Sequence, residues 1–485
     1  MTVTSSSSPA ADRTATDRGD QLPPPDAIVI GAGSGGLTVA VGLSRFGKRV
    51  RLIEKGDVGG DCTNVGCIPS KALLHATAEP AGRGNAEILA HVRDRRDRLR
   101  DEETEHFGSM EGIDLQFGTA RLLGGGRVEV VGSNGRTEIV EAEHVVVATG
   151  SRARRLAIDG LPEERYLTNE ELFEETEAPT KLVIVGAGPI GMEMATAFRR
   201  LGTEVAVLDA APQILPALLP AAAAVVHGAM ENAGVDLRPG LVAKSFDEST
   251  QTLHVGPLDG GATQSIAGVD RVLTAVGRVP NAEDLGLDEL GVELDHGRIV
   301  VNAKGRSNVD NIWAVGDVST EGGTTHIANA WGRRVIKAIV FPPAPAGAKP
   351  LHPAVTFAAP EAASIGSQPV EVPSHVRRIT YDFSKADRSF TDEVDDGVII
   401  VDVRRFSGTI LGATVVGPRA GELISTFSLA MTAGVRLQKW YPVVWPYPAY
   451  SDALGAVVDD FMLEHLKNLH RDFPRWLWGR IRRKS

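Results

Sequence analysis

The sequence predicts an α/β fold in which two Rossmann-like dinucleotide-binding domains are followed by a separate C-terminal α+β domain. Three observations lead to this prediction. A short apolar strand, a glycine-rich turn and an amphipathic helix occur in that order twice. In both copies the first glycine precedes an acidic residue by 23 positions. Beyond a proline-rich linker at 342–350, strand-like runs come first and helical runs later, which is typical of an α+β domain.

Length and composition indicate a globular chain of several domains. The 485 residues correspond to roughly two to four domains, and the apolar and charged fractions are ordinary for a globular protein. A formal net charge of −11 argues against a nucleic-acid-binding protein, which normally carries a basic excess. No apolar run is long enough for a membrane span. Residues 1–24 lack the apolar segment of a secretory signal and are too polar to fold, so we expect a disordered tail.

The first nucleotide-binding unit follows this tail. A strand at 27–30 leads into GAGSGG, which supplies Gly31, Gly33 and Gly36, and a second strand ends at Glu54. Glycines at this spacing permit a tight turn and a close approach of the backbone to a pyrophosphate. The helix N-terminus adds free N–H groups that favour an anion, and the acidic residue accepts hydrogen bonds from ribose hydroxyls.

The same unit recurs in the middle of the chain. KLVIV at 181–185 precedes GAGPIG, which supplies Gly186, Gly188 and Gly191, and the next strand ends at Asp209. The equal spacing argues against a chance match, so we expect two dinucleotide sites. The alternative is that one of the two units is an empty nucleotide fold.

The two cysteines of the chain, Cys62 and Cys67, follow the first unit. Two are too few for a disulfide-stapled secreted fold, and no second pair exists to complete a structural zinc site. A helix is expected to begin near Pro69 or Ser70, and a helix N-terminus stabilises a thiolate. The pair is therefore interpreted as a dithiol–disulfide couple. The alternative is two buried structural cysteines.

A set of motifs then indicates a family. GGDCTNVGCIPSK at 59–71 resembles the redox motif of the class I pyridine nucleotide–disulfide oxidoreductases, which include dihydrolipoamide dehydrogenase, glutathione reductase and mercuric reductase. The other motifs of that family stand in the expected order: ATG at 148–150, GAGPIGME at 186–193, TAVGRVPN at 274–281, IWAVGDV at 312–318 and VTFAAPEAASIG at 355–366. The resemblance runs from about residue 25 to about residue 465.

This resemblance implies a domain order. After the tail at 1–24 we expect an FAD-binding domain at 25–150, an NAD-binding domain at 151–280, a return to the FAD or central domain at 281–345, a dimerisation domain at 350–465 and a basic aromatic tail at 466–485.

The resemblance also implies cofactors and site residues. FAD and NAD(H) are the expected cofactors, no resident metal is expected, and the partners are a second copy of the chain and a small-molecule electron acceptor. Lys71 and Glu193 should meet beside the flavin ring, where each charge offsets the other and Lys71 stabilises reduced flavin. The expected FAD contacts are Gly31, Gly33, Gly36, Glu54, Lys71, Ala120, Thr149, Gly150, Asp317, Thr325 and His326, and the expected NAD contacts are Gly186, Gly188, Gly191, Glu193, Asp209 and Gly277.

Asp209 predicts a preference for NADH over NADPH. A carboxylate at this position accepts a hydrogen bond from a free 2′-hydroxyl and repels a 2′-phosphate. No arginine follows it in AAPQIL to bind that phosphate.

The C-terminal region departs from the family in two places. Where disulfide-reducing members carry HPxxxE, this chain has WPYPAYSDAL, so Tyr447 replaces the histidine base and Asp452 the glutamate. A phenol with an ordinary pKa near 10 is a poor base at pH 7, which argues against efficient turnover of lipoamide or glutathione. Mercuric reductases use a tyrosine, but their C-terminal cysteine pair is absent here. Tyr447 is interpreted either as a functional phenol or as a packing aromatic.

The second departure is the basic aromatic segment LHRDFPRWLWGRIRRKS at 469–485. On a helix it would place aromatic and basic residues as a peripheral membrane segment does, so contact with the inner face of a membrane is one interpretation. A solvated basic tail, or one docked on the acidic body of the protein, is the other. The expected location is otherwise cytoplasmic.

The functional hypothesis is an oxidoreductase that passes electrons from NADH through FAD to Cys62 and Cys67, and on to a disulfide or metal-ion acceptor. Cys67 would be the thiolate beside the flavin and Cys62 would face the acceptor. One alternative is an NADH:quinone or dye reductase, for which a peripheral position at a membrane is one interpretation. Another, from a different class, is an FAD-binding redox sensor without rapid turnover.

Overall fold

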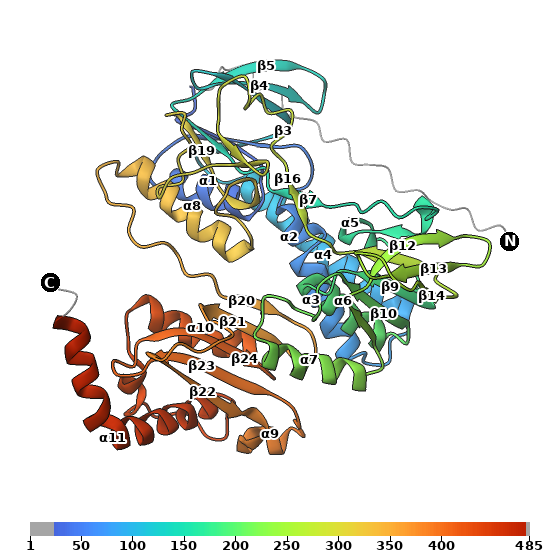
Figure 1. The fold of residues 1–485 in the computed structure, drawn as a ribbon. Helices are drawn as coiled ribbons and strands as arrows, with labels where there is room; N and C mark the ends of the chain where they lie inside the picture. Colours follow the sequence, from blue (N-terminus) through green and yellow to red (C-terminus); the bar gives the residue numbers. More distant parts are fainter. Residues whose placement is uncertain (1–23, 482–485) are drawn as a thin grey trace.

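The structure is a computed structural model that describes residues 24–481, with side chains through residue 467. Three groups of elements share the chain, each built around its own sheet (Figure 1). The tail expected at 1–24 lies almost wholly outside the described residues. The backbone of the basic segment is helical to residue 481, but its side chains lie outside the described part, so its contact with a membrane stays a prediction. Among the described residues, no helix is both long and apolar enough to cross a membrane.

The first sheet has seven strands in the order β19-β6-β1-β2-β3-β4-β5. From β19 to β3 neighbouring strands are parallel, and β4 and β5 add an antiparallel hairpin. Every residue of β1 is buried, as a strand covered on both faces requires. The strands are β1 (Ala27–Ile30), β2 (Val50–Glu54), β3 (Ile113–Gly124), β4 (Arg127–Gly132), β5 (Thr137–Glu141), β6 (His144–Val147) and β19 (Ile312–Ala314).

Two helices that are distant in sequence pack together beside this sheet. Helix α1 (Ser34–Arg45) lies against α8 (Thr325–Val340), as Figure 1 shows. The contact needs small residues, because a Cβ on Gly42 would lie 2.2 Å from Ile336 Cδ1 and a Cβ on Gly332 would lie 2.9 Å from Thr38 Cγ2. Because α1 and α8 approach each other closely, α8 and the loop before it lie next to the first glycine turn.

The second sheet has five parallel strands in the order β11-β10-β9-β15-β8. A smaller antiparallel sheet, β12-β13-β14, lies beside it. The elements are β8 (Tyr166–Leu167), α5 (Asn169–Leu172), β9 (Lys181–Val185), α6 (Pro189–Arg200), β10 (Glu204–Asp209), α7 (Pro220–Asn232), β11 (Asp236–Pro239), β12 (Val242–Asp247), β13 (Thr252–Gly256), β14 (Gln264–Ile266) and β15 (Arg271–Thr274).

Two antiparallel strands connect the first two sheets. β7 (Ser151–Ala153) carries the chain out of the first sheet and β16 (Arg278–Pro280) brings it back. After β16 the chain forms the hairpin of β17 (Leu294–Asp295) and β18 (Arg298–Ile299) and then adds β19 to the first sheet. The crossing strands β7 and β16 therefore connect the sheet that holds the first glycine turn with the sheet that holds the second.

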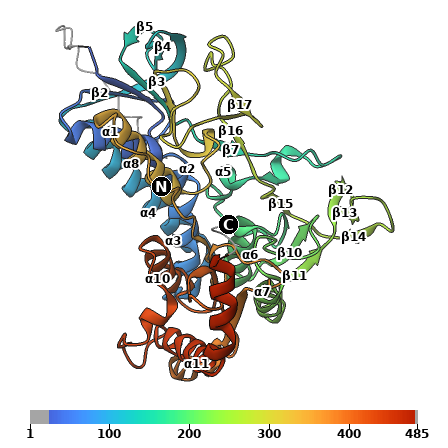
Figure 2. The same cartoon turned by 60° about the vertical axis from the view of Figure 1, so that its left-hand side comes forward.

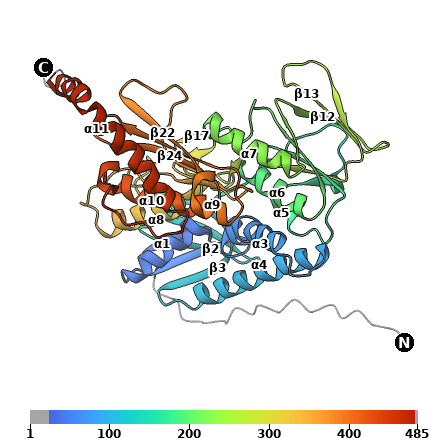
Figure 3. The same cartoon turned by 90° about the horizontal axis from the view of Figure 1, so that it is seen from below.

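The third group is the C-terminal α+β domain that the order of its elements predicts. Its antiparallel sheet runs β20-β21-β24-β23-β22, and α10 and α11 cover it (Figures 2 and 3). The far end of α11 projects away from the body of the protein (Figure 3). The elements are β20 (Ala354–Thr356), β21 (Ala362–Gly366), β22 (Val376–Asp382), α9 (Asp387–Thr391), β23 (Val398–Arg404), β24 (Ile410–Val416), α10 (Ala420–Thr432) and α11 (Asp452–Ile481).

Candidate active site

The first glycine turn lies between β1 and α1 and leaves no room for side chains at two positions. Gly31 has a φ of +105°, and a Cβ there would lie 2.4 Å from the carbonyl oxygen of Ala148. A Cβ on Gly36 would lie 1.9 Å from the carbonyl oxygen of Gly31. At Gly33, the cap of α1, a Cβ would meet no atom closer than 3.9 Å. The turn thus leaves an open cradle at the start of α1, which fits the pyrophosphate of a dinucleotide.

Glu54 closes the other side of this turn. Its carboxylate is buried, Oε2 accepts a hydrogen bond from the Ala32 N–H at 2.6 Å, and Oε1 accepts one from the Gly56 N–H at 2.8 Å. A carboxylate has about four lone-pair sites, so two remain for further donors. The position fits a ribose whose hydroxyls donate to Glu54.

The second glycine turn repeats the geometry of the first. Gly186 has a φ of +113°, and a Cβ there would lie 2.5 Å from the carbonyl oxygen of Ala275. A Cβ on Gly191 would lie 1.9 Å from the carbonyl oxygen of Gly186, the same distance as in the first turn. At Gly188 a Cβ would meet no protein atom within 4 Å. This chain therefore holds two equivalent cradles.

Asp209 matches Glu54 in this second turn. Its Oδ2 accepts from the Ala187 N–H and its Oδ1 from the Ala211 N–H, both at 2.7 Å. Within the described residues neither oxygen is paired with a lysine or arginine. The site therefore presents a negative charge and no cation, which fits a 2′-hydroxyl better than a 2′-phosphate.

The cysteines lie on two short helices after the first unit. Cys62 is in α2 (Gly60–Asn64), and Cys67 is the first residue of α3 (Cys67–Ala78). The expected start near Pro69 or Ser70 is wrong by two or three residues, because Pro69 fits in the first turn, where its missing N–H has no helical partner to lose. Both cysteines are free thiols, and the Thr325 hydroxyl oxygen at the start of α8 lies 3.1 Å from the Cys62 sulfur and 3.9 Å from the Cys67 sulfur.

The environment makes the two sulfurs chemically different. The hydrogen bond from Cys62 lowers the pKa of Cys67 to about 6; burial opposes this shift, and the positive charge of Lys71 adds to it. The same sulfur–sulfur hydrogen bond, together with burial, raises the pKa of Cys62 well above its usual range. At neutral pH Cys67 is therefore the thiolate and Cys62 the thiol.

An ion pair lies one helical turn beyond Cys67. Lys71 Nζ is 2.6 Å from Glu193 Oε2, so α3 and α6 meet here as the sequence analysis expected of this pair. Glu193 is buried, and its other oxygen accepts a hydrogen bond from the Phe357 N–H at 3.0 Å. The Lys71 ammonium also lies over the Phe357 ring, 4.7 Å from its centre. Each of the three groups of elements thus contributes one residue to this ion-pair site: Lys71, Glu193 and Phe357.

Asp317 is held by residues that the sequence analysis did not identify. Its Oδ2 accepts from the Ser151 hydroxyl at 2.7 Å, and Arg278 Nε lies 3.7 Å away. Arg278 also forms an ion pair with Asp61, the residue before Cys62. Partial burial raises the pKa of Asp61, and the charge of Arg278 opposes the rise. The motif TAVGRVPN contains Arg278, but no local signal indicates its partner 217 residues away.

The remaining expected FAD and NAD contacts, except Ala120, lie around the crossing strands and the start of α8. Thr149 donates to the Asn281 carbonyl oxygen at 2.6 Å, and Gly150 has a φ of +67°. His326 Nε2 lies 2.7 Å from the Pro353 carbonyl oxygen. Ala120 lies in β3, opposite Val130 of β4, and Gly277, with a φ of +106°, stands just before β16.

Tyr447 and Asp452 belong to the C-terminal domain. Tyr447 is 70% exposed and donates a hydrogen bond to Asp387 Oδ2 at 2.7 Å. Asp452 is the first residue of α11, and no hydrogen bond joins it to Tyr447 within the described chain. The hydrogen bond and the charge of Asp387 raise the pKa of Tyr447. The carboxylate that holds this phenol therefore comes from α9.

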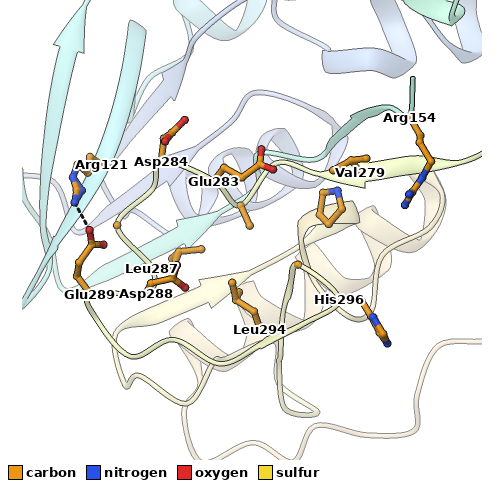
Figure 4. Close-up of a pocket in the computed structure, with 14 residues that line it drawn as sticks. Arg121, Arg154, Val279, Glu283, Asp284, Leu287, Asp288, Glu289, Leu294 and His296 are labelled. Atoms are coloured by element: carbon orange, nitrogen blue, oxygen red, sulfur yellow. Dashed lines mark hydrogen bonds and ion pairs between the residues drawn. The ribbon is translucent and has the colours of Figure 1, made fainter. Parts of the chain in front are cut away.

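A pocket of about 590 Å³ lies apart from these residues, between β16 and the hairpin of β17 and β18 (Figure 4). It is lined by two arginines and four carboxylates, and Arg121 and Glu289 pair at one edge of it at 2.7 Å. None of the predicted site residues lines it. Within the described part of the chain, no group of three or more histidine, cysteine or acidic side chains could hold a metal ion.

Comparison with known proteins adds an independent observation. Residues 25–333 match the family described as pyridine nucleotide-disulphide oxidoreductase, and residues 352–458 match its dimerisation domain. The dihydrolipoyl dehydrogenase of Halobacterium salinarum is 32% identical over 465 residues, which cover 92% of this chain and 98% of that protein. That of Thermus scotoductus is 33% identical over 471 residues, covering 92% and 99%.

Solved structures share the fold. LpdA from Mycobacterium tuberculosis aligns with a TM-score of 0.80 at 25% identity, over 90% of this chain and 99% of its own. The HOCl-induced flavoprotein disulfide reductase RclA from Escherichia coli, solved as a Cu(II) complex, aligns with a TM-score of 0.82 at 24% identity over the same shares.

Proposed function

Because this chain belongs to the pyridine nucleotide–disulphide oxidoreductase family, and is thereby an FAD- and NAD-dependent oxidoreductase acting on a sulfur group, we propose a specific electron path. Electrons pass from NADH through the flavin to Cys62 and Cys67, and leave to a disulfide or metal-ion acceptor. The observation that carries this proposal is the acidified Cys67 at the first position of α3, paired with the thiol of Cys62.

The roles of the residues follow from their surroundings. The cradle at Gly31, Gly33 and Gly36 would hold FAD, with Glu54 on the ribose, and bound flavin would supply the two-electron transfer between nicotinamide and sulfur. The cradle ending at Asp209 would hold NADH. Lys71 keeps a positive charge next to the Cys67 thiolate, and Glu193 orients Lys71.

Cys62 is proposed as the sulfur that meets the acceptor. Its high pKa keeps it protonated at neutral pH, so the proton leaves as the Cys62 sulfur attacks the acceptor disulfide; the acceptor S–S bond breaks, the first product takes this proton and departs as a thiol, and a Cys62–acceptor mixed disulfide forms. The Cys67 thiolate then attacks the Cys62 sulfur, which forms the Cys62–Cys67 disulfide and releases the second product as a thiolate. The dimerisation domain supports a homodimer, and Tyr447 of one subunit would then lie at the sulfur pair of the other. Its phenol stays protonated at neutral pH and so differs from the histidine base that it replaces.

The test separates this path from direct reduction of an acceptor by flavin. Cys62→Ser should lose at least about 10²-fold in NADH-dependent disulfide reduction, because the exchange needs both sulfurs. Anaerobic bleaching of the flavin by NADH should remain. The acceptor panel is lipoamide, glutathione disulfide, quinones and metal ions, and Cu(II) is included because the Escherichia coli protein was solved with it. Full acceptor reduction by Cys62→Ser would refute the sulfur path, and failure of NADH to bleach the flavin would refute the electron path.

A further inference from the structure

The loop that contains Tyr447 is bonded to the short helix α9, which has a carboxylate at each end. Tyr447 donates to Asp387, the first residue of α9, at 2.7 Å. Tyr450 donates to Asp392, just beyond the last residue of α9, also at 2.7 Å. Asp392 is paired with Arg388 at 2.8 Å. Two tyrosine–aspartate hydrogen bonds thus attach the loop to α9.

The two bonds differ in their charge balance. Asp392 has Arg388 as its counter-ion, and the Tyr450 ring stacks on Phe383 with ring centres 5.5 Å apart. Asp387 has no basic partner among the described residues. Asp452, which also raises the pKa of Tyr447 through its charge, has none either. The Tyr447–Asp387 bond is therefore the one that has an uncompensated negative charge beside an exposed phenol.

The hydrogen bond decides what the phenol can offer. A tyrosine hydroxyl has one hydrogen to donate and lone pairs to accept with. Since the hydrogen is engaged by Asp387 and the residue is 70% exposed, the lone pairs of the hydroxyl remain free to meet a donor or a cation. Phe390 of α9 is 85% exposed and Val444, three residues before Tyr447, is 92% exposed, and such exposed apolar side chains are typical of a face that a second subunit covers.

We propose that Asp387, rather than Asp452, is the positioning residue of Tyr447. The negative charges of Asp387 and Asp452 together make the acceptor entrance favour cationic or neutral disulfides over anionic ones. This inference rests on the proposed function, because it assigns the substrate class of the same sulfur pair. Opposite charges attract and like charges repel across such an entrance, and dissolved salt weakens both interactions. An anionic disulfide would approach Asp387 and Asp452, which have no ion-pair partner among the described residues, while the neighbouring Arg388 is paired with Asp392.

A matched series of small disulfides tests the charge preference. Cystamine, bis(2-hydroxyethyl) disulfide and 3,3′-dithiodipropionate are similar in size and carry positive, zero and negative charge. For the wild-type holoenzyme with NADH we expect kcat/KM to fall in that order, by about threefold or more per step at low salt, and the differences to shrink at high salt. Equal values for all three, or the reverse order, would overturn the inference.

A set of variants separates charge, positioning and folding. Asp387→Asn should flatten the charge series, because it removes the negative charge while its amide oxygen still accepts from the phenol. Asp387→Ala should in addition lower kcat for all three disulfides, because no acceptor then fixes the phenol. Tyr450→Phe is the matched control, since it removes the equivalent bond at the other end of α9 without changing a charge and should leave the charge series unchanged. In the Tyr447→Phe background, Asp387→Ala should cause no further loss of kcat. Additive losses, or equal effects of Asp387→Ala and Tyr450→Phe on kcat, would assign Asp387 a purely structural role.

The pH profile gives a second readout. Asp387, with Asp452 as the smaller influence, raises the pKa of Tyr447. Burial raises the pKa of the nearby Tyr381, and the charges of Asp452, Asp387 and Asp382 raise it further. Asp387→Asn should therefore move the alkaline limb of activity to lower pH, and Tyr447→Phe should remove that limb. An unchanged limb in Asp387→Asn would count against the proposal. A wild-type enzyme that reduces no disulfide, although NADH bleaches its flavin, would instead refute the proposed function.

Discussion

The acidity of Cys67 depends chiefly on Cys62, and one substitution tests this. The hydrogen bond from Cys62 is the largest influence on the pKa of Cys67, which lies at about 6; burial acts in the opposite direction, and the charge of Lys71 lowers the pKa further. Cys62→Ala removes the first influence and keeps Lys71 in place. We expect the pKa of Cys67 to rise from about 6 toward the ordinary thiol value of about 8.5.

The size of the effect at neutral pH follows from these values. A thiol with a pKa of about 6 is roughly 90% thiolate at pH 7, whereas one with a pKa of about 8.5 is roughly 3% thiolate. The thiolate population therefore falls by up to about thirtyfold, and less if Lys71 and the start of α3 keep part of the shift. The direction of the change follows from the pKa of Cys67: the wild-type thiolate is lost as the pH falls through about 6, and the variant loses its thiolate at a higher pH.

The assay is a pH titration of thiolate absorbance in the ultraviolet. Cys62 and Cys67 are the only cysteines in the chain, so Cys62→Ala leaves a single thiol, and Cys62→Ala/Cys67→Ser provides the blank. Reduced wild-type protein should show a first transition at about pH 6 from Cys67. A variant that still titrates at about 6 would show that the sulfur–sulfur hydrogen bond is not the main cause.

Three further predictions concern the nucleotide turns and the crossing strands. Asp209→Ala should raise the KM for NADH at least about tenfold and raise that for NADPH less; an unchanged NADH preference in steady-state kinetics would contradict the role of the carboxylate. Gly191→Ala should lower the free energy of unfolding by about 1–3 kcal/mol because its Cβ would overlap a carbonyl oxygen, whereas Gly188→Ala should keep the thermal midpoint and weaken only NADH binding. Equal thermal midpoints for the two would contradict this. Arg278→Gln should destabilise the fold by up to about 1 kcal/mol by leaving Asp61, whose side chain is 44% exposed, unpaired, and adding Asp61→Asn should recover part of the loss in thermal denaturation; no recovery would indicate that the ion pair is not the cause.

Local patterns predicted the elements that carry the nucleotide turns. The strands at 27–30 and 181–185 occur as expected, and Glu54 and Asp209 occupy matching places in the two units. These features are determined within one βαβ unit, where the glycine turn, the strand and the acid lie close in sequence. The start of α3 was placed too late because proline is normally a helix boundary, although it is tolerated in the first turn.

The fold class, the two cradles and the identity of the sulfur pair could be predicted from the sequence, because each is indicated by motifs whose residues lie within about 25 positions of one another. The side chains that hold the functional groups in place are visible in the folded structure alone. Arg278 pairs with Asp61 across 217 positions, and Tyr447 bonds to Asp387 across 60, contacts that follow from how sheets and helices pack and leave no periodic signal in the chain. The difference in acidity between Cys62 and Cys67 likewise arises from the folded surroundings, since both are ordinary thiols in the unfolded chain.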